Sequence, residues 1–163
     1  MWAFSIRTSR NVIEGTLEYR RAEYSINFTP YPSFPEDGPP IHVLGTTSIA
    51  LGTLQIEIDV DTRRLLYVWG YFPKALSTRQ SLKPGIIESG EVVLASPDVR
   101  LVRGVAVGYE PSALWDIGYD ESTGWVHFGS SAEGQRLVKI ASDTALALEG
   151  QELRGVWMRP IIS

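Results

Sequence analysis

The chain contains no cysteine and only two histidines, His42 and His127, which removes several kinds of chemistry. Without cysteine there is no disulfide, thiolate metal ligand or cysteine nucleophile. A serine triad would have to use one of the two histidines, and the Gly-x-Ser-x-Gly elbow is absent. Phosphate loops, dinucleotide glycine motifs and zinc-binding histidine pairs are also absent. We therefore predict no catalytic residue, no cofactor and no metal site.

Two further absences concern location. The first residues lack the charged leader and long apolar core of a secretory signal. No stretch approaches the ~18 uninterrupted apolar residues that a membrane helix needs. We therefore expect a cytoplasmic protein with no membrane partner.

Basic residues are in the minority. The chain has 15 lysines and arginines against 19 aspartates and glutamates, a formal charge of −4 and a pI near 5.2. This balance disfavours a broad phosphate-binding surface, so nucleic acid is not expected as a partner. The local exceptions, Arg20-Arg21 and Arg63-Arg64, are typical of solvated residues at strand edges and turns.

Strand-like sequence, in contrast, is plentiful. Three turn-punctuated strand pairs are predicted, at residues 54–69, 114–128 and 144–157. In the first pair, apolar and polar residues alternate strictly in the order Leu54, Gln55, Ile56, Glu57, Ile58, Asp59, Val60. A period of two indicates a strand with one buried face.

The register of this first pair follows from its loop. A two-residue loop at Thr62-Arg63 and a four-residue loop at 61–64 predict the same pairing parity. That parity places Leu65, Tyr67 and Trp69 on the buried face, opposite Val60, Ile58 and Ile56. A three-residue loop would set the carboxylates opposite the aromatics, which the pattern argues against.

Glycine and aspartate mark the other turns. Gly150 supplies the positive φ of a tight hairpin, and Asp120 begins a turn that Gly124 closes. Further strands are predicted at residues 2–8, 16–28, 41–50, 86–95 and 99–109. A Ser96-Pro97-Asp98 turn separates the last two. The segment 73–85, bounded by prolines, is predicted to be one short helix or an irregular loop.

These features predict a mainly β fold formed by one domain over residues 1–163. A chain of this length, 44% hydrophobic, is expected to bury roughly 70% of its unfolded surface. Roughly ten strands in a largely antiparallel sheet must protect their edges by closing or by stacking. We favour a curved or barrel-like sheet, with a β-sandwich as the alternative and at most one short helix.

Aromatic residues are the first candidates for binding. Trp115, Tyr119 and Trp125 gather around one turn, where an outward face forms a binding platform and an inward face forms core. Tyr31 and Phe34 lie in a proline-rich segment, 29–40, which is either a surface connection or a semi-rigid loop that engages a partner.

Carboxylates are the second candidates. Glu57 and Asp59 project from the same strand face, about 7 Å apart by strand rise. Such a pair is compatible with acid and base catalysis or with a hard cation. The same pattern is typical of a solvated face whose charges keep the protein soluble.

Three functions are compatible with these features. The leading hypothesis is a noncatalytic protein-interaction domain that neutralises or regulates a partner protein with a basic surface, through Trp115, Tyr119, Trp125, Tyr31, Phe34, Glu57 and Asp59. The alternatives are a β-barrel that binds a small apolar ligand and a hydrolase that uses acidic residues.

Overall fold

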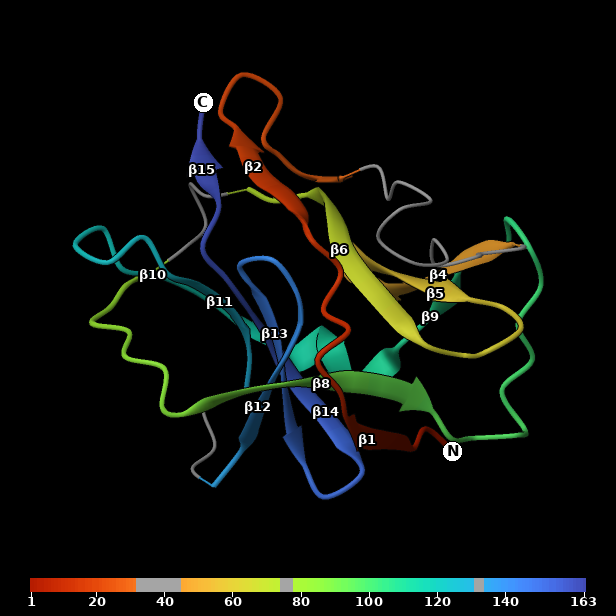
Figure 1. Cartoon of the computed structure of the whole chain (residues 1–163). Coiled ribbons are helices and arrows are strands. Elements are labelled where there is room, and N and C mark those ends of the chain that lie inside the picture. The colour runs from red at the N-terminus through yellow and green to blue at the C-terminus, as the bar shows by residue number, and fades with distance from the viewer. Residues whose placement is uncertain (32–44, 74–77, 131–133) are drawn as a thin grey trace.

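The computed structural model describes residues 1–31, 45–73, 78–130 and 134–163, which form two facing β-sheets (Figure 1). The strands are β1 (Phe4–Thr8), β2 (Gly15–Arg20), β3 (Ser25–Pro30), β4 (Thr46–Leu51), β5 (Leu54–Asp59), β6 (Leu65–Tyr71), β7 (Thr78–Arg79), β8 (Ile87–Leu94), β9 (Val107–Gly108), β10 (Asp116–Tyr119), β11 (Val126–Gly129), β12 (Arg136–Ala141), β13 (Thr144–Glu149), β14 (Glu152–Met158) and β15 (Ile161–Ile162). A 3₁₀ helix, η3 (Glu110–Leu114), precedes β10. Among the described residues, no helix has the length and apolar character needed to cross a membrane.

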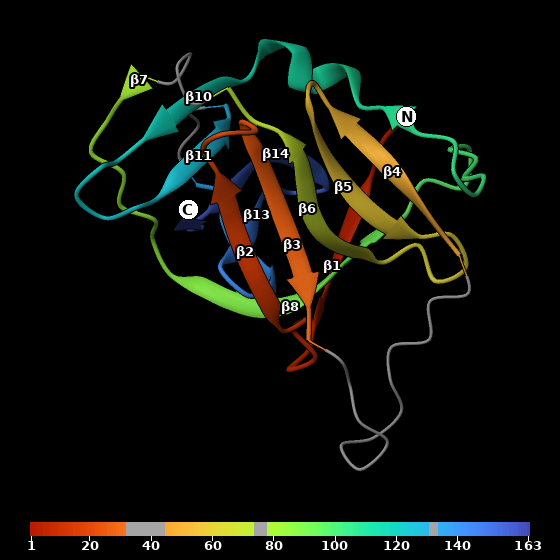
Figure 2. The same ribbon diagram turned by 90° about the horizontal axis from the view of Figure 1, so that it is seen from above.

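The two sheets are open. One has the strand order β1-β8-β12-β13-β14-β11-β10-β7, and the other has the order β15-β2-β3-β6-β5-β4-β9. In Figure 2 the seven-stranded sheet lies in front of the eight-stranded one. Within the described ranges neither sheet closes on itself, so the barrel prediction is corrected in favour of the sandwich alternative.

Most of the sheet edges are protected by the short length of their edge strands. Three of the four edge strands, β7, β9 and β15, contain two residues each and pair in parallel with β10, β4 and β2. An edge of two residues offers little backbone to another chain. The parallel pair β8·β12 joins long strands, and the other described pairs are antiparallel, as predicted.

The sheets are also joined at two corners. At one, Ile13 bridges to Ala141, and the Ser142 amide donates to the Ile13 carbonyl over 2.9 Å. At the other, Arg64 bridges to Val93 in β8. These links hold the two sheets to each other through the neighbouring strands β8 and β12.

Arg63 secures the second corner. Its guanidinium donates to the carbonyl oxygens of Leu94 (3.3 Å), Ser96 (2.6 Å) and Val99 (2.8 Å). The neighbouring Arg64 is paired with Glu91 at 3.3 Å. The predicted position of this arginine pair at a turn is confirmed, but the predicted solvation is wrong, because both side chains bind neighbouring segments.

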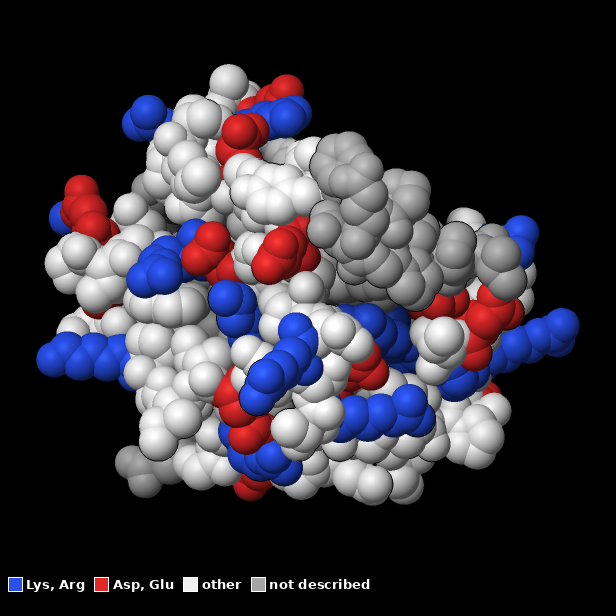
Figure 3. Space-filling model, in the orientation of Figure 1, with Lys and Arg blue, Asp and Glu red and all other residues white. Residues whose placement is uncertain are grey.

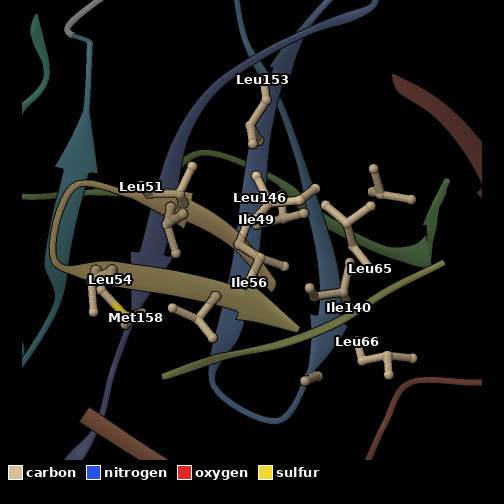
Figure 4. Close-up of a cluster of buried hydrophobic side chains, with 14 of the residues drawn as sticks. Ile49, Leu51, Leu54, Ile56, Leu65, Leu66, Ile140, Leu146, Leu153 and Met158 are labelled. Carbon is tan, nitrogen blue, oxygen red and sulfur yellow. The ribbon is translucent and has the colours of Figure 1, made fainter. Parts of the chain in front are cut away.

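The core lies between the sheets and takes side chains from both. Figure 4 shows part of this cluster, with labelled residues from β4, β5, β6, β12, β13 and β14. The alternating apolar residues of the first predicted pair, Leu54, Ile56 and Ile58, are at most 1% exposed. The predicted buried face of this strand is confirmed.

All three predicted strand pairs exist, as β5·β6, β10·β11 and β13·β14. Gly150 has φ +60° and Gly124 has φ +80°, and the Gly124 amide donates to the Asp120 carbonyl over 2.8 Å. The predicted turn at Ser96 is also present. The residue types at these three turns therefore predicted the turn positions correctly.

Other boundaries differ from the prediction. Residues 16–28 belong to two strands, β2 and β3, because the chain turns at 21–24 and Tyr24 adopts φ +51°. Residues 99–109 are largely irregular, with strand only at β9. In the described part of 73–85 the chain forms β7 and irregular structure rather than a helix.

A β-bulge corrects the predicted register of β5 and β6. Ile58 pairs with Leu65, but Glu57 pairs with Tyr67, so Leu66 is an extra residue on β6. An extra residue moves every following side chain to the other face of the sheet. Leu65 is buried as predicted, whereas Tyr67 and Trp69 lie on the outer face with Glu57.

Candidate functional site

Trp115 and Tyr119 face inward. The Trp115 ring centroid lies 5.8 Å from that of Tyr109 and 5.4 Å from that of Phe128. Tyr119 is half-buried and packs against the same core, as does Ile117. Of the two interpretations of this aromatic face, the structure shows the inward one, in which the rings extend the core.

Trp125 lies on the opposite face of the same sheet. There it joins a group that we call the outer cluster: Trp125, His127, Trp157 and Arg159. The Trp157 ring is 6.1 Å from Trp125 and 4.6 Å from His127, and the Arg159 guanidinium is 5.0 Å from the Trp125 ring centroid. Sequence alternation predicted that Trp125 and His127 share a face, but Trp157 and Arg159 come from β14 and its end.

His127 rests on two glycines. A Cβ at Gly129 would lie 2.9 Å from His127 Nε2, and one at Gly155 would lie 3.1 Å from it. Nε2 is buried, as is Trp157 Nε1, and neither has a hydrogen-bond partner in the described structure. This close approach explains why glycines face each other across β11 and β14.

Acidification is expected to destabilise the protein through His127. Burial lowers the pKa of His127 below its ordinary 6.5, so the unfolded chain takes up this proton at a higher pH. Stability is full above the unfolded-state pKa and is lost as the pH falls through the folded-state value. Urea unfolding at about pH 7.5 and about pH 5.5 should therefore show a larger loss for the wild type than for His127→Gln. Equal losses in the two proteins would contradict this role.

Asp59 is not a surface carboxylate. It is 2% exposed, accepts from the Asp61 amide over 3.0 Å and from the Thr62 hydroxyl over 2.9 Å. These bonds hold the turn before Arg63, which has φ +62°. The prediction that Asp59 lies on a solvated face with Glu57 is wrong, because the turn uses its carboxylate.

Glu57 is half-buried on the outer face of the seven-stranded sheet. One oxygen, Oε1, accepts from Ser48 Oγ over 2.7 Å and from Trp69 Nε1 over 3.0 Å. Ser48 and Tyr67 are its direct cross-strand partners on β4 and β6. Burial and then the charge of Glu57 raise the pKa of Tyr67, so its phenol stays neutral at neutral pH.

Four aromatic residues lie on this outer face or at its margin, and we call them the aromatic strip: Tyr24, Tyr67, Trp69 and Tyr71. Tyr24 and Tyr71 are 50% and 48% exposed, with ring centroids 6.3 Å apart. Tyr67 is partly buried, packs against the core and stacks on the core residue Phe28 at 5.0 Å and 20°. Tyr67, Trp69 and Tyr71 are spaced by two along β6, which the sequence shows. The face that they occupy depends on the bulge at Leu66.

Of the two predicted loop aromatics, the structure describes Tyr31. Tyr31 is 59% exposed, and Thr16 Oγ1 lies 3.3 Å from its hydroxyl. Phe34 and His42 lie outside the described residues. Charges on the face shown in Figure 3 are interspersed rather than separated by sign.

The predicted acids and His127 do not lie together, since Glu57 and His127 occupy the outer faces of different sheets. In the part of the chain that the structure describes, no group of three or more His, Asp or Glu side chains is placed to hold a metal ion. No family model, curated protein or solved structure matches the chain, so no relative indicates its function.

Proposed function

We propose that this chain is a noncatalytic protein-binding domain whose partner presents a basic surface. The contact surface is the outer face of the seven-stranded sheet, around Glu57 and the aromatic strip. This assignment moves the proposed surface away from Trp115, Tyr119 and Asp59, which pack against the core or hold a turn. Trp125 lies on the opposite side of the molecule and is not part of it.

The observation that carries the proposal is a carboxylate that has no cation partner among the described residues and lies beside the half-buried rings of Tyr67 and Trp69. Ion pairs of the described residues occupy Glu18, Glu91 and several other acids, but none includes Glu57. Its described hydrogen bonds come from neutral donors, so no cation of the described ranges compensates its negative charge. A complementary basic surface would supply that cation.

The aromatic strip supplies the apolar part of such an interface. Tyrosine and tryptophan are enriched among residues that dominate binding energy, because they bury large areas with few rotatable bonds. The side chains of Tyr24 and Tyr71 are about half exposed. Tyr67 and Trp69, which lie on the same outer face, are more buried. This gradient gives a rigid centre and an accessible margin.

The test is affinity capture with three matched baits. They are the wild type, a Tyr24→Ser/Tyr71→Ser double variant and a Leu114→Ser control, in which an 89% exposed leucine outside the strip loses its apolar side chain. We expect a basic protein to be captured by the wild type and the control, and to fall about tenfold or more with the double variant. Capture should weaken with added salt.

Folding of each bait is checked by thermal unfolding before capture. If the double variant folds and retains the same proteins as the control, the strip is not the contact surface. If the proteins that it loses are acidic, the charge assignment is overturned.

A further inference from the structure

We infer that Glu57, Trp69 and Tyr67 form a receptor for one arginine side chain of the partner. This inference deepens the proposed function and rests on it for the source of the arginine. The ligand chemistry is a guanidinium group, which carries a positive charge on a flat, delocalised fork of N–H donors.

The carboxylate is fixed in advance. Both described hydrogen bonds of Glu57 end on Oε1, one from β4 through Ser48 and one from β6 through Trp69. Two donors on one oxygen fix the rotation of the group and leave Oε2 without a described bond. A side chain held in this way loses little freedom when a ligand binds.

Glu57 differs in this respect from the other buried or half-buried acids. Asp59 and Asp120 accept bonds from the amides and hydroxyls of their own turns, and Asp120 also accepts from the Leu82 amide. Glu91 is paired with Arg64. Glu57 lies in mid-strand, where no turn needs its charge, and its bonds instead orient it on a flat face.

The neighbouring rings favour arginine over lysine. Trp69 is tied to the carboxylate by its indole N–H, which places its ring beside the charge. Tyr67 is held by its stack on Phe28 and lies directly across from Glu57. A guanidinium can stack on an aromatic face while donating to a carboxylate, whereas an ammonium is a compact, strongly hydrated charge.

The test uses two short peptides, acetyl-Gly-Arg-Gly-amide and its lysine counterpart, titrated into the ¹⁵N-labelled protein. The readout is the indole Nε1–H resonance of Trp69, assigned by its loss in Trp69→Phe. We expect a saturable shift with the arginine peptide at roughly millimolar affinity, at least about fivefold tighter than with the lysine peptide. Glu57→Gln, which keeps the shape of the side chain, should weaken arginine binding about tenfold.

Glu110→Gln is the matched control. Glu110 Oε2 also accepts from a tryptophan, Trp2 Nε1, at 3.3 Å, but on an exposed part of the molecule. This variant should bind the arginine peptide as the wild type does. No shift in the wild type, equal affinity for the lysine peptide, or an unchanged affinity in folded Glu57→Gln would each overturn the receptor.

The two proposals fail separately. If protein capture depends on Tyr24 and Tyr71 but the arginine peptide does not bind, the receptor is wrong and the contact surface stands. If the peptide binds as expected and the strip variants capture the same proteins as the control, the receptor stands and the protein-binding assignment of the strip fails.

Discussion

Replacing Gly129 with alanine is expected to lower the free energy of unfolding by about 3 kcal/mol. The new Cβ would lie 2.6 Å from both the Arg154 carbonyl oxygen and the Gly155 Cα. Both obstacles are backbone atoms of β14, so neither can move without shifting the centre of the eight-stranded sheet. The midpoint of thermal unfolding should fall by roughly 6–12 °C for a domain of this size.

Gly85→Ala is the control for this substitution. A Cβ at Gly85 meets nothing within 4 Å, and its φ is not in the left-handed region. Alanine there should leave stability unchanged or raise it by up to about 1 kcal/mol, because it restricts the unfolded chain. If calorimetry gave Gly129→Ala and Gly85→Ala the same midpoint, the close contact of β11 with β14 would not exist.

Truncating Leu146 to alanine is expected to cost about 3 kcal/mol. Leu146 is 0% exposed and sits in β13, between Val138 of β12 and Val156 of β14. Figure 4 places it within the group of side chains that fills the space between the two sheets. Loss of its isobutyl group removes contacts and leaves a cavity that rigid sheets cannot readily close.

Urea unfolding measures this cost, with Leu114→Ala as the reference. Leu114 is 89% exposed on η3, so its truncation should change stability by no more than about 0.5 kcal/mol. A Leu146→Ala protein as stable as the reference would show that the facing sheets do not pack through this residue.

Much of the fold was predictable from local chemistry. The strict alternation from Leu54 to Val60 and the glycine at position 150 act within a few residues, so the sequence displays them directly. The hairpins and the inward packing of Ile56 and Ile58 followed from them. The choice between barrel and sandwich did not, because it depends on pairings between distant segments such as Ile13 with Ala141.

The candidate site was less predictable because one inserted residue controls it. Leu65 and Leu66 are adjacent residues of the same type, and both are buried. No sequence pattern distinguishes a bulged leucine from an ordinary strand residue, yet this bulge moves Tyr67 and Trp69 to the outer face. Asp59 was misplaced for a related reason, since the turn that needs its carboxylate begins one residue earlier than the alternation suggests.

Three of the four sheet edges have two residues each and are poor sites for adding a strand, whereas the fourth edge, β1, has five. Binding by strand addition needs a row of unpaired amides and carbonyls, and β7, β9 and β15 each expose too short a row to select a peptide. The recognition that we propose at the broad face would instead use side chains that stand perpendicular to the sheet. A partner at the proposed surface could therefore keep its own folded conformation, whether it presents its positive charge from a helix, a loop or a strand.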